Sequence, residues 1–140
     1  MALSNIGGGS QVGDGNTAEI QMGVQAAQQT ATVTATLSVA QITGGILVGN
    51  PSTSAATYTL PTATLIDATM TNAKTNSTFD LTVINIGTSN GIITMAVGTG
   101  ITAVGNLLVA ITGSAAGVGG AALFQFRKTG DAAYTVYRMA

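Results

Sequence analysis

Residues 87–91 read GTSNG, which matches the G-x-S-x-G spacing of a hydrolase nucleophile centred on Ser89. That chemistry needs a strand, a sharp turn and a helix, with a base within reach of the serine hydroxyl. The chain contains no histidine, and the segment after the motif, IITMAV, has the composition of a strand. No local spacing pairs Ser89 with Lys74 or Lys128. We therefore expect Ser89 to be a turn residue and the protein not to be an enzyme.

The remaining polar residues give no stronger chemical pattern. Asp14, Asn16 and Glu19 lie in the segment DGNTAE, but they lack the ligand periodicity and the following glycine of a calcium loop. Nothing in the sequence brings Asp67 and Asp80 together as a carboxylate pair. The chain has no cysteine, so it has neither a disulfide framework nor a thiolate metal site. We expect no metal and no cofactor.

The composition points to a surface that another chain covers. Charged residues make up 6% of the sequence, and none lies between Asp80 and Arg127, whereas an ordinary soluble domain has roughly 25%. Such a surface gains little solubility from charge. The alternative is a monomer coated in threonine, serine and asparagine. The net charge of −1, without a basic cluster, argues against nucleic acid as the main partner.

Residues 1–30 are rich in glycine, glutamine and asparagine and show no helical period. They predict an extended arm that is ordered only against a partner; a tail without fixed structure is the alternative. The first 15 residues contain no lysine, no arginine and no apolar run, so we expect no secretion signal and folding in a cytoplasm. Isolated apolar residues in the arm are its predicted partner contacts: Ile6, Val12, Ile20 and Met22.

Residues 31–140 predict an all-β domain. Short alternating or apolar segments such as TATVTATLSV, GGILVG and TYTLP are separated by turn residues. One helix is expected at about residues 62–73, with Thr62 as its N-cap. About eight short strands with one helix indicate a β-sandwich or jelly-roll-like fold.

Two hairpins are predicted from their turn residues. Asn90-Gly91 is the stronger signal, and a two-residue turn there places Ile86 opposite Met95. A second turn at Gly130-Asp131 places Phe124 opposite Tyr137, and Arg127 opposite Tyr134 in a cation–π contact. These registers give the predicted core or trimer-packing residues: Ile84, Ile86, Met95, Val97, Phe124 and Tyr137.

Residues 101–124 carry no charge and are long enough to span a bilayer. Their glycines and polar interruptions weaken a helix, and the alternation around them fits strands better. A membrane-spanning protein is therefore the alternative, and a domain without a membrane partner is the expectation.

Three segments in order, TYTLPTATLIDATM, STFDLTVINIGTSNGIITMAVGTGITAVGN and FQFRKTGDAAYTVYRM, resemble a module of virion structural proteins from tailed bacteriophages, especially marine ones. The resemblance covers roughly residues 42–140. It implies a compact, typically trimeric β domain on the virion, which decorates and cements the capsid by binding the major capsid protein. The alternative it leaves open is a tail fibre or appendage that binds a host receptor through loops such as residues 114–120.

Overall fold

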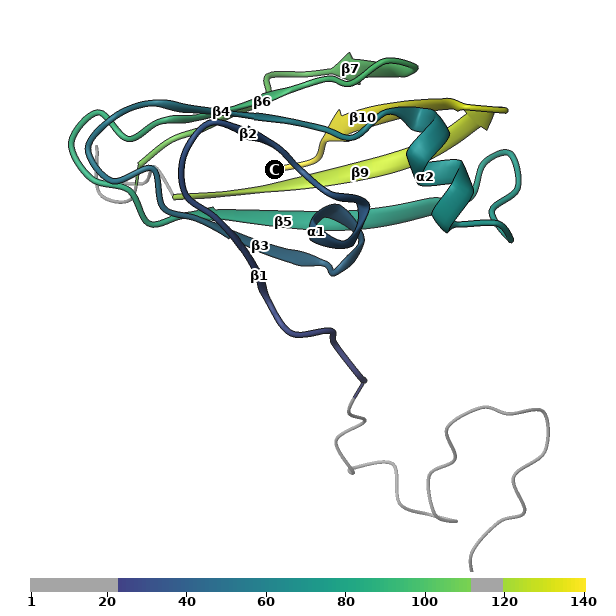
Figure 1. The fold of residues 1–140 in the computed structure, drawn as a ribbon, viewed down its shortest axis with the longest axis horizontal. Helices are drawn as coiled ribbons and strands as arrows, with labels where there is room; N and C mark the ends of the chain where they lie inside the picture. The colour runs from purple at the N-terminus through teal and green to yellow at the C-terminus, as the bar shows by residue number, and fades with distance from the viewer. Residues whose placement is uncertain (1–22, 112–119) are drawn as a thin grey trace, which may run out of the picture.

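The computed structural model describes residues 23–111 and 120–140, which form a mostly β protein (Figure 1). Within these ranges there are ten strands and two helices, where the sequence predicted about eight strands and one helix. The elements in chain order are β1 (Gln29–Ala31), β2 (Ala35–Thr36), α1 (Val39–Thr43), β3 (Ile46–Gly49), β4 (Ala56–Thr59), α2 (Ala63–Thr69), β5 (Thr78–Asn85), β6 (Ile93–Ala96), β7 (Ile101–Val104), β8 (Leu108–Val109), β9 (Ala121–Gly130) and β10 (Ala133–Arg138).

The strands form two sheets, and the chain alternates between them. The larger sheet has six strands in the order β1-β3-β5-β9-β10-β7, and the smaller has four in the order β2-β4-β6-β8. Up to β8, each strand lies in the other sheet from the one before it. Strands β1, β3 and β5 are therefore parallel neighbours, as are β2, β4 and β6. From β1 to β6 the chain therefore winds around the core like a helical coil, and each of its three turns contributes one strand to each sheet.

The crossings between the sheets differ at the two ends of the coil. Helices α1 and α2 carry the chain from the smaller sheet to the larger one; in Figure 1, α1 lies near the middle and α2 on the right. Loops 32–34, 50–55 and 86–92 carry it from the larger sheet to the smaller one, on the left. After β8, the long hairpin β9–β10 completes the larger sheet, with β9 antiparallel to β5.

The two sheets share one hydrophobic core. The strands alternate buried and more exposed residues, as in the burial of Leu81 and Val83 on β5. Side chains from the smaller sheet, such as Tyr58 and Ile93, are also fully buried and belong to the same cluster. The Tyr58 hydroxyl lies 3.0 Å from the carbonyl oxygen of Ala31, to which it donates, and so ties the second turn of the coil to the first. Burial raises the pKa of this phenol, so it stays protonated.

Helix α2 confirms the predicted helix in a shorter form. Thr62 is its N-cap, and the Thr62 side chain accepts a hydrogen bond from the Leu65 amide. Helix α1 is not among the elements predicted from the sequence: the predicted strand TATVTATLSV ends at Val39, the first residue of the helix, and residues 40–43 carry no prediction. Its start carries a capping box, in which Ser38 and Gln41 each bond the other's backbone.

The Asn90-Gly91 hairpin prediction is wrong. Strands β5 and β6 lie in different sheets, and β6 pairs with β4 and β8 instead. Residues 86–92 cross between the sheets, and the buried Asn85 at the end of β5 holds this loop through the carbonyl of Gly91 and the amide of Gly87, each at 2.8 Å. A local turn signal gives no information on which strand pairs with which after the turn.

The C-terminal hairpin is confirmed, but its predicted register is off by one residue. Phe124 pairs with Arg138, and Tyr137 pairs with Gln125. The cause is the position of the turn, which lies at Asp131-Ala132 and not at Gly130-Asp131, so that Ala133 pairs with Gly130. A bulge between Ala133 and Tyr134, next to Ala132 with a φ of +47°, then moves the register back by one residue. The shift changes the cation–π partners, so that Arg127 lies over the ring of Tyr137 and not opposite Tyr134.

Two further sequence predictions, the boundary of the arm and the possible membrane segment, fall partly within the residues that the structure describes. Residues 23–28 have no regular structure and are exposed, and β1 begins two residues before the predicted domain boundary. The described residues of segment 101–124 form β7, β8 and the start of β9. Among the residues that the structure describes, no helix has the length and apolar character that crossing a bilayer requires.

Candidate functional site

Ser89 lies in the loop that crosses from β5 to β6. It is exposed, and its backbone has a φ of +54°. The element after it is a strand of the other sheet, so the strand–turn–helix geometry of a nucleophile elbow is not formed. Within residues 23–111 and 120–140, no group of acidic, histidine or cysteine side chains could hold a metal ion. Ser89 therefore occupies a turn position.

A polar cluster around Asp67 joins helix α2 to the β9–β10 hairpin. Asp67 Oδ1 lies 2.7 Å from Lys128 Nζ and 2.7 Å from the hydroxyl of Tyr134, and both groups donate to it. Asp67 Oδ2 accepts a hydrogen bond from the Ala132 amide at 2.7 Å. The hydrogen bonds from Lys128, Tyr134 and Ala132, in that order, lower the pKa of Asp67 to about 2.

This cluster is a structural contact. Lys128 is buried, with a side chain 10% exposed, and its ammonium group is satisfied by Asp67. Burial, reinforced by the Asp67 carboxylate, raises the pKa of Tyr134 far above its ordinary value. A base with a depressed pKa and a phenol with a raised one are poor proton-transfer partners near neutral pH. The cluster holds α2 against the hairpin, and its members are too far apart in the sequence to be paired by spacing.

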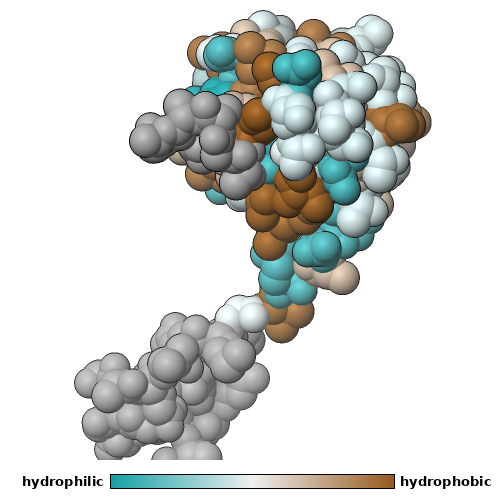
Figure 2. All heavy atoms as spheres, turned by 90° about the vertical axis from the view of Figure 1, so that its left-hand side faces the viewer, coloured by the Kyte–Doolittle hydropathy of each residue, from teal (hydrophilic) through white to brown (hydrophobic). Residues whose placement is uncertain are grey.

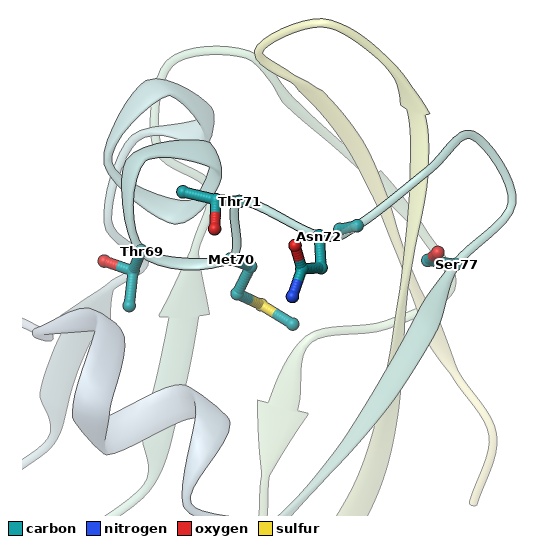
Figure 3. Close-up of a pocket in the computed structure, with 6 residues that line it drawn as sticks. Thr69, Met70, Thr71, Asn72 and Ser77 are labelled. Carbon is teal, nitrogen blue, oxygen red and sulfur yellow. The ribbon is translucent and has the colours of Figure 1, made fainter.

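A cavity of about 320 Å³ lies where α2 leads into β5 (Figure 3). Figure 3 shows Met70 and Asn72 on the loop after the helix, with Ser77 on the other side of the hollow. Two of its hydroxyl groups are already engaged, because Thr69 donates to the Leu65 carbonyl and Ser77 accepts from the Lys74 amide. The lining residues include no acid and no base: Thr69, Met70, Thr71, Asn72, Ala73 and Ser77.

The predicted core or trimer-packing residues fall into three groups. Met95 and Phe124 are buried in the core, as predicted. Ile84, Ile86 and Tyr137 lie outside the core; their alternation with the buried residues places them on the outer face of the six-stranded sheet. The prediction that Ile86 belongs to the core of the single chain is wrong, because it is 51% exposed.

Val97 also lies outside the core, 42% exposed after β6, so its assignment to the core of the single chain is wrong. The cause is the same for both residues: the predicted β5–β6 hairpin does not exist, and its register placed them facing inward. A trimer-packing role for Ile84, Ile86, Val97 and Tyr137 stays a prediction. The predicted arm contacts Ile6, Val12, Ile20 and Met22 lie outside the described residues, as do most of the loop residues 114–120.

The charged residues of the described ranges belong to a few elements, and among them Arg138 reaches the smaller sheet through the Leu108 carbonyl of β8. They lie on α2, on the loop after it, on β5 and on the β9–β10 hairpin: Asp67, Lys74, Asp80, Arg127, Lys128, Asp131 and Arg138. The four strands of the smaller sheet carry no charged residue, and neither do the crossing loops 32–34, 50–55 and 86–92. We call the end formed by these three loops the uncharged end.

Large apolar side chains are exposed at the uncharged end. Val33 is 73% exposed, and Ile86 and Ile92 are also exposed. Figure 2 views the molecule from this side and shows hydrophobic residues at the surface among the hydrophilic ones. Single exposed apolar residues are normal on a protein surface. Several of them on a surface region without charged side chains are unusual and mark a possible contact site. The candidate functional site is therefore an interaction surface, and the sequence signal for it was the long stretches without charge.

No protein family, curated protein or solved structure matches the chain. The functional argument therefore rests on the residues of this chain and on the resemblance described above.

Proposed function

We propose that the protein is a non-enzymatic structural component of a virion. In this proposal it forms a trimeric decoration or cement protein that binds the outer surface of a phage capsid and stabilises the shell. Its partners are further copies of itself and the major capsid protein. The two sheets then act as a β-sandwich of the jelly-roll-like kind that the resemblance implies.

The observation that carries this proposal is the uncharged part of the exterior of the described fold. The four-stranded sheet and three adjacent loops contain no Asp, Glu, Lys or Arg, while Val33, Ile86 and Ile92 are exposed at these loops. Such a surface is typical of a protein that buries much of its exterior in contacts with other subunits. A cement protein also needs no catalytic group, because many weak contacts repeated over a lattice supply its avidity.

The arm fits the same proposal. The chain enters the larger sheet at β1, an edge strand, and residues 23–28 before it are exposed. An N-terminal segment of 22 residues before Gly23 could span up to about 70 Å when extended. That length is enough to reach a neighbouring subunit, and the apolar residues Ile6, Val12 and Ile20 would be its anchors.

The test is immunogold labelling of intact particles produced from the genome that encodes this chain. The antibody is raised against the purified protein. Gold over the outer surface of the heads supports the proposal. Gold confined to the tail would overturn it in favour of a tail appendage that binds a receptor, and particles without gold would overturn both.

A further inference from the structure

The outer face of the six-stranded sheet carries an apolar centre. On β3, Ile46 and Val48 alternate with the buried Leu47, so they point away from the core. On β5, Ile84 alternates with the buried Val83 and Asn85, and on β9, Leu123 alternates with Ala122 and Phe124. All four outward residues remain partly exposed in the described part of the chain: Ile46, Val48, Ile84 and Leu123.

The strand register gathers these residues into adjacent rows. Val48 pairs with Ile84, which pairs with Ala121 in turn. In the next row, Ile46 pairs with Thr82, and Thr82 pairs with Leu123. Two more exposed apolar residues border these rows, because the Ile86 amide bonds the Gly49 carbonyl and the Met139 amide bonds the Leu123 carbonyl. We call these six residues the apolar sheet face: Ile46, Val48, Ile84, Ile86, Leu123 and Met139.

Parallel strands are normally covered on both faces of their sheet. Strands β1, β3 and β5 are parallel, and β3 reads Ile-Leu-Val with large apolar residues on both of its faces. Its inner face packs in the core through Leu47, while Ile46 and Val48 are left partly exposed. This is the pattern of a strand whose second face is buried in an assembly.

The polar end of the same face has the composition of an interface rim. Arg127 donates through Nε and Nη2 to the hydroxyl of Tyr137, at 3.1 and 2.9 Å, and through Nη1 to Asn76 Oδ1 at 2.9 Å. These contacts hold the guanidinium group in place. Arginine and tyrosine are enriched among the residues that dominate binding energy in protein interfaces.

The charges of this face favour a second copy as the occupant. Asp80 accepts a hydrogen bond from Gln125 and supplies one negative charge, and Arg127 supplies one positive charge. The face therefore has no net charge to repel its own copy, and it carries one charge of each sign, so that Asp80 of one copy can attract Arg127 of another. The face offers no electrostatic complementarity to a strongly acidic or strongly basic partner.

We propose that the apolar sheet face, with Arg127 and Tyr137 at its rim, is the surface through which this protein binds further copies of itself. The inference deepens the proposed function, because it rests on the trimer and assigns the trimer contact to this face. Ile86 belongs to both surfaces, whereas the rest of the uncharged end, with Val33 and Ile92, and the arm remain available for the capsid.

The experiment compares native masses, measured by size-exclusion chromatography with light scattering, at one protein concentration. Ile84→Glu places a carboxylate at the centre of the face, and Ile86→Glu does so at an exposed position where folding is at little risk. Thr94→Glu is the matched control, because Thr94 is also partly exposed and points outward from the smaller sheet. Circular dichroism reports whether each variant is folded.

We expect the wild type and Thr94→Glu to have three times the mass of the 13.8 kDa chain, and the two isoleucine variants to fall to one chain while folded. If Ile84→Glu does not fold, the native mass of Ile86→Glu alone tests the inference. A monomeric wild type, folded isoleucine variants of unchanged mass, or loss of the trimer in Thr94→Glu would each overturn the inference. A wild-type trimer that labels no particle would instead refute the proposed function and leave this interface standing.

Discussion

Asn85 of β5 and Val109 of β8 lie in different sheets, and the Asn85 side-chain amide donates to the Val109 carbonyl at 3.0 Å. The same amide group also bonds the Gly91 carbonyl, and Asn85 Oδ1 accepts from the Gly87 amide. Asn85 is fully buried. One side chain therefore fixes the crossing loop 86–92 and attaches the edge strand of the smaller sheet to the larger one.

Replacement of Asn85 by leucine is predicted to lower the free energy of unfolding by about 2–4 kcal/mol, because it leaves buried backbone groups without this partner. Urea unfolding followed by circular dichroism measures the change. Asn90→Ala, in the same loop but exposed, is the control and should change stability by less than about 0.5 kcal/mol. Equal stability of Asn85→Leu and the wild type would contradict the role given to Asn85.

The Asp67 cluster predicts a specific acid sensitivity. The folded-state pKa of about 2 lies below the ordinary value of 3.8, so ionised Asp67 stabilises the fold above about pH 4. That contribution is lost as the pH falls through about 2. We expect the melting temperature of the wild type to exceed that of Asp67→Asn at pH 6 by a margin that shrinks on acidification. Since the other carboxylates titrate in both proteins, a margin that is independent of pH would exclude this explanation.

Gly49 lets the two sheets approach each other closely. A Cβ at this position would overlap Ile93 Cδ1 and would lie 2.9 Å from Tyr58 Cε2. Gly49→Ala should therefore destabilise the protein by about 1–3 kcal/mol. Ile93→Val removes the overlapping methyl group, so the double variant should lose less stability than the two single variants together. Strictly additive losses in chemical denaturation would show that the overlap is not the cause.

Deletion of residues 1–24 tests the arm. Gln25, whose side chain bonds the Gly44 carbonyl, and β1 are retained in this variant, so the fold should keep its melting temperature. Binding to undecorated capsids, measured by co-sedimentation, should be lost because the apolar anchors Ile6, Val12, Ile20 and Met22 are removed. Unchanged binding would exclude the arm as the partner contact.

The sequence was sufficient to predict those helices and strands whose signal lies within a few neighbouring residues. The Thr62 cap and the apolar spacing after it predicted α2, and alternation predicted most strands. Helix α1 was also visible in principle, because Ser38 and Gln41 have capping-box spacing. It was missed because Ser38 and Val39 were assigned to the end of the preceding strand, which left only four helical residues without an element.

The pairing of strands could not be read from the sequence. A turn forms near Asn90, but its central residues are Ser89 and Asn90, because the Gly91 amide bonds the Thr88 carbonyl. The strands on its two sides belong to different sheets, and the side chain of Asn85 bonds the carbonyls of Gly91 and Val109 there. In the C-terminal hairpin, the turn lies at Asp131-Ala132, one residue later than predicted, and a bulge follows it. Together they displace the pairs from Tyr134 to Arg138 by one residue, so that Tyr137 lies on the outer face and not in the core.

The candidate surface was predicted only in part. The stretch without charge between Asp80 and Arg127 is visible in the sequence, and it indicated a surface covered by another chain. Ile84 and Ile86 were singled out for packing, but Ile46, Val48 and Leu123 were not, because their grouping depends on strands β3, β5 and β9 being neighbours. The Asp67 contacts with Lys128 and Tyr134 depend on tertiary structure in the same way.

The most direct test of the central claim is the number of copies of this chain in purified virions, measured by quantitative mass spectrometry against the major capsid protein. A trimeric decoration protein predicts a copy number of the same order as that of the major capsid protein, retained after the particles are washed. Absence from the purified particles, or only a few copies for each virion, would contradict the account.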